Sequence, residues 1–464
     1  MMQLSEAVRA VRGELHGTDV TFDAVCADSR VVKSGDLFVA LKGARFDGHD
    51  FVPHAARAGA AAALVQRERA AALTAALPLA AVSDPAAALG ALAAHWRSRF
   101  DLPLVAVAGS NGKTTVKEMI ASCLREHWGR ASVLAAYGNL NNHIGLPLTL
   151  LGLCREHRAA VVELGINHPG ETAYLAGIAR PTIALVNNAQ REHQEFMKSV
   201  AEVAVEHGAL FASLSDDGIA VINADDEHAD YWRTVAADRQ IRDFGLEATA
   251  AVQARYRLTA LTAQIEVHAP EGNASFTLQV PGQHNVRNAA AAIAAATAAG
   301  ASLAACACAL ARFAPVAGRM QARTGLSGAC ILDDTYNANP DSVRAAIAVL
   351  ARAAGRKLLV LGDMGEVGTQ GAAYHQEVGA YAQTAGVDCL YTLGDLAAHA
   401  ARSFGAGARH FTRIEDLLAE VENALGPDVT LLVKGSRFMQ MERVVKAFAV
   451  DGEAKDDRRE GATS

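Results

Sequence analysis

Residues 104–115, with the sequence LVAVAGSNGKTT, have the residue types and the order of a phosphate-binding loop. The apolar run predicts a buried strand, the two glycines predict a tight turn, and apolar residues at helical spacing after the turn predict a helix. Free N–H groups at the helix start and the Lys113 ammonium attract phosphate, and the Thr114 hydroxyl is a ligand for Mg²⁺. The predicted phosphate-binding residues are Gly109, Ser110, Asn111, Gly112, Lys113, Thr114 and Thr115.

This loop is shorter than a complete Walker A sequence, which has glycine where this chain has Val107. What remains is Gly-x-x-Gly-Lys-Thr. The alternative is a glycine turn beside an unrelated lysine. The order of strand, turn and helix around the segment favours phosphate binding over that alternative.

Polar side chains follow two further strand-like runs, at the point where each run ends. Glu163 ends one of them, and His193 follows the other, which ends at Asn187. In open α/β sheets, ligands bind beyond the carboxyl ends of the strands, so these residues and Thr114 could together hold Mg²⁺. The alternatives are a helix cap or ion pair for Glu163 and a surface loop for His193. A bound triphosphate needs its metal nearby, which favours the metal site.

Asparagines gather at two other places. Asn285 and Asn288 flank the start of an alanine-rich helix, where they are either helix caps or amides that bind an adenine edge. Asp334, Asn337 and Asn339 follow a later strand, where an ordinary turn is the alternative. Further polar residues at strand ends are Asp363, Glu366, Lys434 and Arg437. So much polarity at one sheet edge predicts a cleft.

The elements that must position these residues alternate between strand-like and helical patterns, which predicts an α/β fold with largely parallel sheets. We expect three domains: a small α/β domain over 1–81, a central phosphate-loop domain over 82–315, and a Rossmann-like, doubly wound domain over 316–450. Residues 252–280 alternate apolar and polar side chains, which predicts antiparallel strands or a hairpin. Residues 451–464 are charged and are expected to form a disordered tail.

Composition excludes several classes of protein. At 464 residues the chain is too long for one ordinary domain, and its net charge of −7 gives no indication of nucleic-acid binding. We find neither an apolar run of about 18 residues nor a signal-peptide core, so no membrane span is expected. The seven scattered cysteines are typical of a reducing compartment, which predicts a cytoplasmic protein.

With these motifs in view, the chain resembles the Mur ligase family of ATP-dependent amide-forming enzymes over nearly its whole length. The phosphate loop marks the wider family. The asparagine-rich segments 139–142 and 336–339 are typical of its D-alanyl-D-alanine-adding branch. The matching segments are 28–30, 35–38, 109–115, 138–142, 145–149, 163–165, 284–285, 318–319, 334–340 and 362–364.

The resemblance implies ligation of D-alanyl-D-alanine to UDP-N-acetylmuramoyl-tripeptide through an acyl phosphate, in peptidoglycan precursor synthesis, with ATP and Mg²⁺ as cofactors. The first domain would bind the UDP end of the substrate, the central domain ATP, and the last domain would close over the site and help to receive the dipeptide. The implied catalytic residues are Lys113, Glu163 and His193, and the implied metal ligands are Thr114, Glu163 and His193. Besides the phosphate loop, the implied ATP-binding residues are Asn285, Asn288, Arg319 and Asp334. The implied substrate-binding residues are Ser29, Arg30, Asn139, Asn142, Asn337 and Asn339.

One position departs from the family pattern. Family members commonly carry a lysine, carbamylated in use, 14 residues after the histidine that matches His193, and this chain has His207 there (207 − 193 = 14). Histidine cannot supply the anionic bridge that a carbamate offers to a second Mg²⁺. Either the second cation is held differently, through water or Glu206, or the enzyme relies less on it. Lys198 is near in sequence but off register.

Other functions stay open on the sequence alone. One is a related ligase with another amine substrate, either the third-residue-adding Mur ligase or a folylpolyglutamate synthase. Another is a non-catalytic switch that uses ATP hydrolysis to drive a partner. This alternative gives the polar segment 28–30 no role. The base for the attacking amine is not identifiable, and His193 and His207 are candidates only by their pKa range. We expect a monomer.

Overall fold

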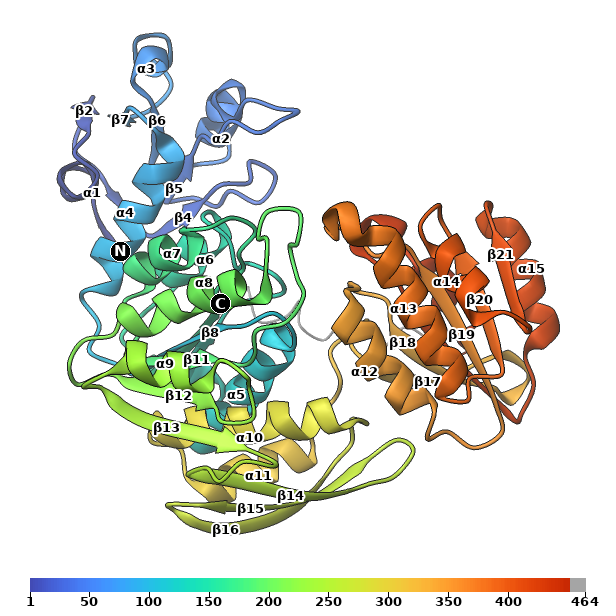
Figure 1. Ribbon diagram of the computed structural model, residues 1–464. Coiled ribbons are helices and arrows are strands. Elements are labelled where there is room, and N and C mark those ends of the chain that lie inside the picture. Colours follow the sequence, from blue (N-terminus) through green and yellow to red (C-terminus); the bar gives the residue numbers. More distant parts are fainter. Residues whose placement is uncertain (451–464) are drawn as a thin grey trace.

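Three multi-stranded β-sheets, each packed with helices, organise the computed structural model, which describes residues 1–450 (Figure 1). The sheets take their strands from 14–82, 104–278 and 321–434, and we call the parts around them the N-terminal, central and C-terminal lobes. The predicted α/β fold class is confirmed. The predicted disordered tail, 451–464, lies outside the described residues.

The N-terminal lobe has a five-stranded sheet in the order β2-β7-β6-β5-β4, parallel except for the β2–β7 pair. A separate antiparallel pair joins β1 and β3. Its elements are β1 (Met2–Gln3), α1 (Leu4–Ala10), β2 (Glu14–His16), β3 (Thr21–Phe22), β4 (Ala24–Cys26), β5 (Asp36–Val39), a 3-10 turn (Gly48–Phe51), α2 (Val52–Arg57), β6 (Ala62–Gln66), α3 (Arg67–Leu73) and β7 (Leu79–Val82). Helix α4 (Pro85–Arg97) leads on to the central lobe. The Asp84 carboxylate caps its start by accepting from the N–H groups of Ala86 and Ala87.

The central lobe has a nine-stranded sheet in the order β16-β15-β14-β13-β12-β11-β8-β10-β9. Strands β14 to β16 pair antiparallel, which confirms the prediction for 252–280. The elements are β8 (Leu104–Ala108), α5 (Lys113–Trp128), a 3-10 turn (Arg130–Ser132), β9 (Val133–Ala135), α6 (Gly145–Leu151), β10 (Ala159–Glu163), α7 (Glu171–Ala179), β11 (Ile183–Val186), α8 (Val200–Ala212), β12 (Ile219–Asn223), α9 (Ala229–Ala236), β13 (Gln240–Gly245), β14 (Val252–Leu258), β15 (Ala263–Ala269), β16 (Gly272–Leu278), α10 (Gln283–Ala298) and α11 (Leu303–Ala311).

Two apolar clusters sandwich the central sheet. One face packs against α5, α10 and α11, and the other against α4 and α6 to α9. The alternation of strand side chains between the two clusters, such as Val105 and Val107 on one face and Ala106 and Ala108 on the other, is what a sheet covered on both faces requires.

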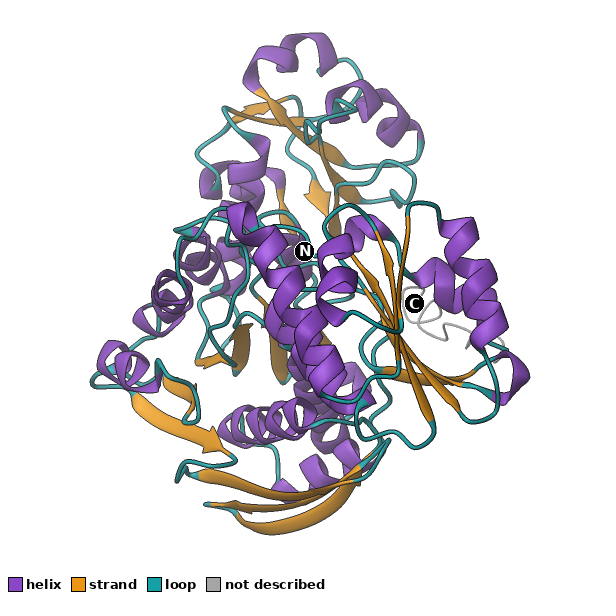
Figure 2. Ribbon diagram, turned by 45° about the vertical axis from the view of Figure 1, so that its right-hand side comes forward, coloured by secondary structure: helices purple, strands orange, loops and turns teal. Residues whose placement is uncertain are grey.

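The C-terminal lobe has a six-stranded sheet in the order β17-β18-β22-β19-β20-β21, parallel except at β17. Helices cover both of its faces (Figure 2). The elements are β17 (Gln321–Thr324), a 3-10 turn (Leu326–Gly328), β18 (Cys330–Asp334), α12 (Pro340–Leu350), β19 (Arg356–Gly362), a 3-10 turn (Gly368–Gln370), α13 (Gly371–Thr384), β20 (Cys389–Leu393), α14 (Ala397–Phe404), β21 (Ala408–Phe411), α15 (Ile414–Ala424), β22 (Val429–Lys434), a 3-10 turn (Arg437–Met439) and α16 (Glu442–Phe448).

The strand order brings the predicted site residues to one edge of the central sheet. Strand β8 lies between β10 and β11, with Glu163 opposite Val107 and Val186 opposite Ala108. The phosphate loop, Glu163 and the loop after β11 therefore start from neighbouring carboxyl ends. Among residues 1–450, no helix is long and apolar enough to span a membrane.

Candidate active site

A cleft of about 530 Å³ lies between the central and C-terminal lobes, beyond the carboxyl ends of β8, β10 and β11. Phosphate-loop residues Ser110 to Thr115 line it. So do most of the other predicted site residues: Asn139, Asn142, Glu163, His193, Asn285, Asn288, Arg319, Asp334, Asn337 and Asn339. Three predicted residues do not line the cleft: Gly109, Ser29 and Arg30. The structure thus gathers one set of residues from seven separate regions of the sequence.

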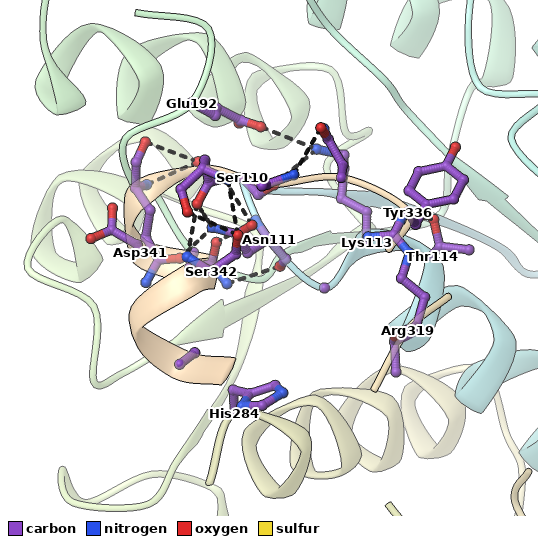
Figure 3. Close-up of a pocket in the computed structure, with 18 of the residues that line it drawn as sticks. Ser110, Asn111, Lys113, Thr114, Glu192, His284, Arg319, Tyr336, Asp341 and Ser342 are labelled. Carbon is purple, nitrogen blue, oxygen red and sulfur yellow. Dashed lines mark hydrogen bonds and ion pairs between the residues drawn. The ribbon is translucent and has the colours of Figure 1, made fainter. Parts of the chain in front are cut away.

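The phosphate loop is held tightly against its surroundings. Helix α5 begins at Lys113, and the preceding Gly112 has a φ of 84°, in the left-handed region that favours glycine. A Cβ at Gly112 would lie only 2.6 Å from Asn288 Oδ1. Lys113 Nζ curls back, donating to the carbonyl oxygen of Gly109 at 2.6 Å, and lies 3.4 Å from a Glu192 carboxylate oxygen (Figure 3). The loop N–H groups of Ser110 and Asn111 donate to Asn188, while Lys113 and Thr114, at the start of α5, line the cleft.

Glu163 is fixed at the end of β10 and is only 3% exposed. Its Oε2 accepts from the Thr114 hydroxyl at 2.9 Å, and its Oε1 accepts from the Asn141 amide at 2.8 Å. The carboxylate and the Thr114 hydroxyl therefore lie side by side, as the sequence predicts. Carboxylates and hydroxyls are the oxygen ligands that suit Mg²⁺.

Asn141 was missed as a site residue, although it lies inside the asparagine-rich segment that the sequence singles out. Its neighbour Asn142 has other partners: Asn142 Oδ1 accepts from the N–H groups of Ile144 and Gly145 just before α6. The sequence pattern could identify the segment. The choice among its asparagines depends on which side chain the turn directs at Glu163.

His193 lies in the same cleft under backbone strain. Its φ is 48°, uncommon for a residue with a side chain, and its Nδ1 lies 2.6 Å from an oxygen of Glu366, whose φ is 57°. The interaction with His193 lowers the pKa of Glu366. The three-residue metal set of Thr114, Glu163 and His193 stays a prediction. Residues 1–450 contain no cluster of three or more His, Cys, Asp or Glu side chains suited to a metal, so a cation here would need hydroxyl and phosphate oxygens as well.

Glu192 is a cleft residue that the sequence analysis missed. It is 7% exposed, and its Oε1 lies 2.9 Å from Nε2 of His207, which is fully buried. Burial alone would raise the pKa of Glu192, but Lys113, His207 and His193 outweigh it and lower that pKa to about 2. The carboxylate is therefore charged next to the phosphate loop. Its position directly before His193 was visible in the sequence, but its partner on α8 was not.

Glu206, one of the alternatives for holding a second cation, lies outside the cleft, so that alternative is wrong. Its two oxygens accept from the N–H groups of Gly170 and Thr172 at 2.8 and 2.7 Å, which stabilises the start of α7. It is buried, and it is not among the residues that line the cleft.

The asparagines at the start of α10 already bond to one another. Asn288 donates to Asn285 Oδ1 at 3.1 Å and accepts from the Asn187 amide at 2.9 Å, while Asn285 donates to the carbonyl oxygen of Pro281. Through Asn187, which also donates to the carbonyl oxygen of Asn111, this network supports the phosphate loop. The contact of Asn285 and Asn288 with adenine stays a prediction.

His284, next to these asparagines, is a further cleft residue that was matched to the family without a role. Burial lowers the pKa of His284 to about 4, although Asp334 opposes this shift. The ring is therefore neutral at pH 7, and it offers a flat, uncharged surface to a ligand in the cleft.

The C-terminal lobe contributes charged side chains to the opposite wall. The Arg319 guanidinium stacks 3.9 Å from the ring centroid of Tyr336, and its Nη2 lies 3.4 Å from the Thr114 hydroxyl. Asp334 pairs with Lys434 at 2.5 Å, across the neighbouring strands β18 and β22. Arg319 thus faces the place where phosphate would sit beside Thr114.

The lobes are joined around the cleft by polar contacts. Asn339 donates to Asn111 Oδ1 at 2.9 Å, which links the start of α12 to the phosphate loop. Arg191, on the loop after β11, pairs with Asp341 and with Glu377, both at 2.6 Å. These two carboxylates raise the pKa of Arg191 further above its ordinary value. The arginine is thus a charged connection between the central and C-terminal lobes.

Replacing Arg191 with alanine is expected to lower kcat/KM about tenfold, because about 1.4 kcal/mol of lost stabilisation of the closed lobes changes an equilibrium by that factor. Steady-state kinetics and the radius of gyration in solution, both with nucleotide present, measure the effect. Arg344→Ala is the matched control, since Arg344 pairs with Glu377 within the C-terminal lobe. Equal losses in the two variants would contradict a role in holding the lobes together.

The predicted uridine-binding residues lie apart from the cleft, in the N-terminal lobe. Arg30 makes a two-point ion pair with Asp28, which lowers the pKa of Asp28 to about 2. Contact of Ser29 and Arg30 with a uridine stays a prediction.

Comparison with known proteins gives the class to which this fold and cleft belong. Residues 21–97 match the description "Mur ligase family, catalytic domain", residues 107–296 match "Mur ligase middle domain", and residues 318–437 match "Mur ligase, glutamate ligase domain". The chain belongs to the Mur ligase family and is an ATP-dependent ligase, as its sequence predicts.

Its relatives point to one branch of the family. It is 40% identical to the UDP-N-acetylmuramoyl-tripeptide–D-alanyl-D-alanine ligase of Escherichia coli, over 97% of this chain and 98% of that one. It is 33% identical to the Bacillus subtilis protein of the same name, over 96% of each chain. The crystal structure of MurF from Acinetobacter baumannii superposes with a TM-score of 0.88 at 33% identity, covering 95% of this chain and 97% of that one. The crystal structure of MurF ligase from Thermotoga maritima in complex with ADP superposes with a TM-score of 0.79 at 27% identity. It covers 91% of this chain and 96% of that one.

Proposed function

We propose that this enzyme joins D-alanyl-D-alanine to UDP-N-acetylmuramoyl-tripeptide at the expense of ATP, in peptidoglycan precursor synthesis. The observation that carries the proposal is the cleft itself, in which Lys113, Glu163 and Arg319 converge from both lobes beside the asparagine-rich segment 139–142. The names of the full-length relatives support the choice of substrates.

The chemical difficulty is that a carboxylate is a poor acyl donor. Transfer of the γ-phosphoryl group to the tripeptide carboxylate converts its oxygen into a phosphate leaving group. The neutral amine of the dipeptide then attacks the carbonyl carbon, the bond between that carbon and the phosphate oxygen breaks, and phosphate departs. The nitrogen loses one proton to phosphate or water as the amide forms. The Lys113 ammonium, the N-terminus of α5 and Arg319 reduce repulsion between the two anions of the first step.

The donor set at Thr114 and Glu163 fits Mg²⁺, because a buried carboxylate and a hydroxyl lie 2.9 Å apart at the phosphate loop. When bound, Mg²⁺ neutralises phosphate charge during transfer. The adjacent Asn141 holds the carboxylate in place. We propose that Thr114, Glu163 and His193 hold the Mg²⁺ ion.

An acyl phosphate hydrolyses when water reaches it, so the cleft must be covered during the reaction. The contacts of Arg191 and Asn111 with the C-terminal lobe bring that lobe over the phosphate loop. We assign Asn139, Asn142, Asn337 and Asn339 to the peptide end of the substrate, and Ser29 and Arg30 to its uridine end. We place the reaction in the cytoplasm, where ATP is available, and expect a monomer.

A screen of amine substrates tests the proposal. The purified chain, with ATP and UDP-N-acetylmuramoyl-tripeptide, is expected to release phosphate stoichiometrically with amide only when D-alanyl-D-alanine is added. Release with a single amino acid instead would identify one of the related ligases. Phosphate release without any UDP-muramyl peptide would indicate an ATP-driven switch.

A further inference from the structure

The two oxygens of the buried Glu192 carboxylate face different partners: Oε1 faces His207, and Oε2 faces the cationic side of the cleft, at Lys113 and His193. A carboxylate only accepts hydrogen bonds, so His207 Nε2 donates to Glu192 Oε1 at 2.9 Å. This leaves Oε2, which lies 3.4 Å from Lys113 Nζ and 3.7 Å from His193 Nε2. His207 Nδ1 has no hydrogen-bond partner among the described residues. Among those residues, the imidazole ring of His207 therefore makes its hydrogen bond to Glu192 alone.

Lys113 is a counter-charge of Glu192 only while the lysine is folded back on its loop. In that position the ammonium also bonds to the carbonyl oxygens of Gly109 and Ser110. A phosphate in the loop competes for the same ammonium, since this lysine serves as its counter-charge. A phosphate that bonds to this ammonium would lie close to Oε2 of Glu192, and a buried carboxylate beside phosphate is strongly unfavourable without a cation between them.

The position of the pair also matches the departure seen in the sequence. His207 stands on α8, where a carbamylated lysine would reach toward the cleft and end in an anion. In this chain the imidazole at that position bonds to Glu192, and the Glu192 carboxylate lines the cleft. The lysines that line the cleft, Lys113 and Lys434, both have other partners: Lys434 pairs with Asp334.

We propose that Glu192, oriented by His207, supplies the carboxylate ligand for a second divalent cation at the phosphates, in place of a carbamylated lysine. The inference rests on the proposed ATP site. A divalent cation at a nucleotide needs only one or two protein carboxylates, because phosphate oxygens and water complete its shell. Glu163 and Glu192 would then serve one cation each, in the arrangement that two-metal enzymes use to hold both sides of a phosphoryl group.

Manganese binding, counted by electron paramagnetic resonance with a non-hydrolysable ATP analogue, tests the ligand role directly. The wild-type complex is expected to bind about two Mn²⁺ per chain, and Glu192→Gln about one. Glu206→Gln is the matched control: Glu206 is an equally buried glutamate, but it caps α7 outside the cleft, so this variant should keep about two. An unchanged count in Glu192→Gln, or a count of one in the wild type, would overturn the proposal.

His207 is a positioning residue in this proposal, and two substitutions separate positioning from folding. Glutamine can still donate to Glu192, whereas leucine cannot. His207→Leu is expected to weaken the second Mn²⁺ site at least about tenfold, and His207→Gln to retain most of its affinity. Equal Mn²⁺ affinity in both variants would contradict the role of His207. Thermal unfolding of each variant identifies any that fails to fold.

Carbon dioxide provides the complementary test. Activity of the wild type is expected to be unchanged after removal of carbon dioxide and bicarbonate, because the ligand is a glutamate. A rate restored by bicarbonate would mean that a lysine is carbamylated, which would overturn the proposal. The Mn²⁺ count requires only nucleotide binding, so its failure is distinguishable from a failure of the wild-type enzyme to form the amide.

Discussion

Lys113→Ala is expected to lower amide formation by at least about 10³-fold while the fold stays intact. The Nζ of Lys113 is the cation that the phosphate loop brings to the transferred phosphoryl group, and no other lysine of the described chain is placed to replace it: Lys117 is fully buried against the carbonyl oxygen of Ala136, and Lys434 pairs with Asp334. The loss should appear mainly in kcat, because the charge on the phosphoryl group changes most during its transfer.

Structural damage from this substitution should be small. Lys113 bonds mainly to carbonyl oxygens of its own loop, and alanine is a good residue for the first turn of α5. The measurement is amide formation by rapid quench, together with thermal unfolding. Lys198→Ala is the control, because Lys198 is exposed and lies outside the cleft. Near wild-type turnover in Lys113→Ala would show that the phosphate-loop assignment is wrong.

The sequence predicted those parts of the site that depend on local order along the chain. The phosphate loop, Glu163 at the end of β10 and the polar residues after β18 each follow a strand with an apolar pattern, and parallel strands bring their carboxyl ends to one edge. The start of α4 also depends on local order, because Asp84 before Pro85 favours a helix N-terminus, and the Asp84 carboxylate caps that helix.

The residues it missed acquire their roles through contacts that no local pattern encodes. Glu192 has its role because α8 places His207 within hydrogen-bond distance of its carboxylate. Arg191 has its role because the C-terminal lobe places two carboxylates, those of Asp341 and Glu377, against its guanidinium. Glu206 shows the converse: a carboxylate next to the anomalous His207 in sequence points instead to the start of α7. In a helix, adjacent residues face directions about 100° apart, so neighbours in sequence need not share a site.

Glu163→Gln is expected to lower kcat/KM by about 10²- to 10³-fold and to raise the Mg²⁺ concentration needed for half-maximal activity. Glutamine has the shape of glutamate, and its amide can still meet Thr114 and a reoriented Asn141 amide, so the end of β10 should keep its structure. What is lost is the negative charge that makes the pair with Thr114 a site for a cation. Kinetics titrated with Mg²⁺, with thermal unfolding in parallel, measure both effects.

Asn141→Ala separates the charge of Glu163 from its orientation. This variant keeps the carboxylate but removes the amide that holds Oε1, so a smaller loss is expected, about tenfold, with a smaller shift in the Mg²⁺ requirement. Glu206→Gln should change neither quantity by more than about twofold, because its carboxylate lies outside the cleft. If Glu163→Gln left the Mg²⁺ requirement unchanged while activity fell, the carboxylate would act on the substrate and not on the cation. The order of the three variants therefore decides whether the contact between Glu163 and Thr114 is a metal site or a structural hydrogen bond at the start of α5.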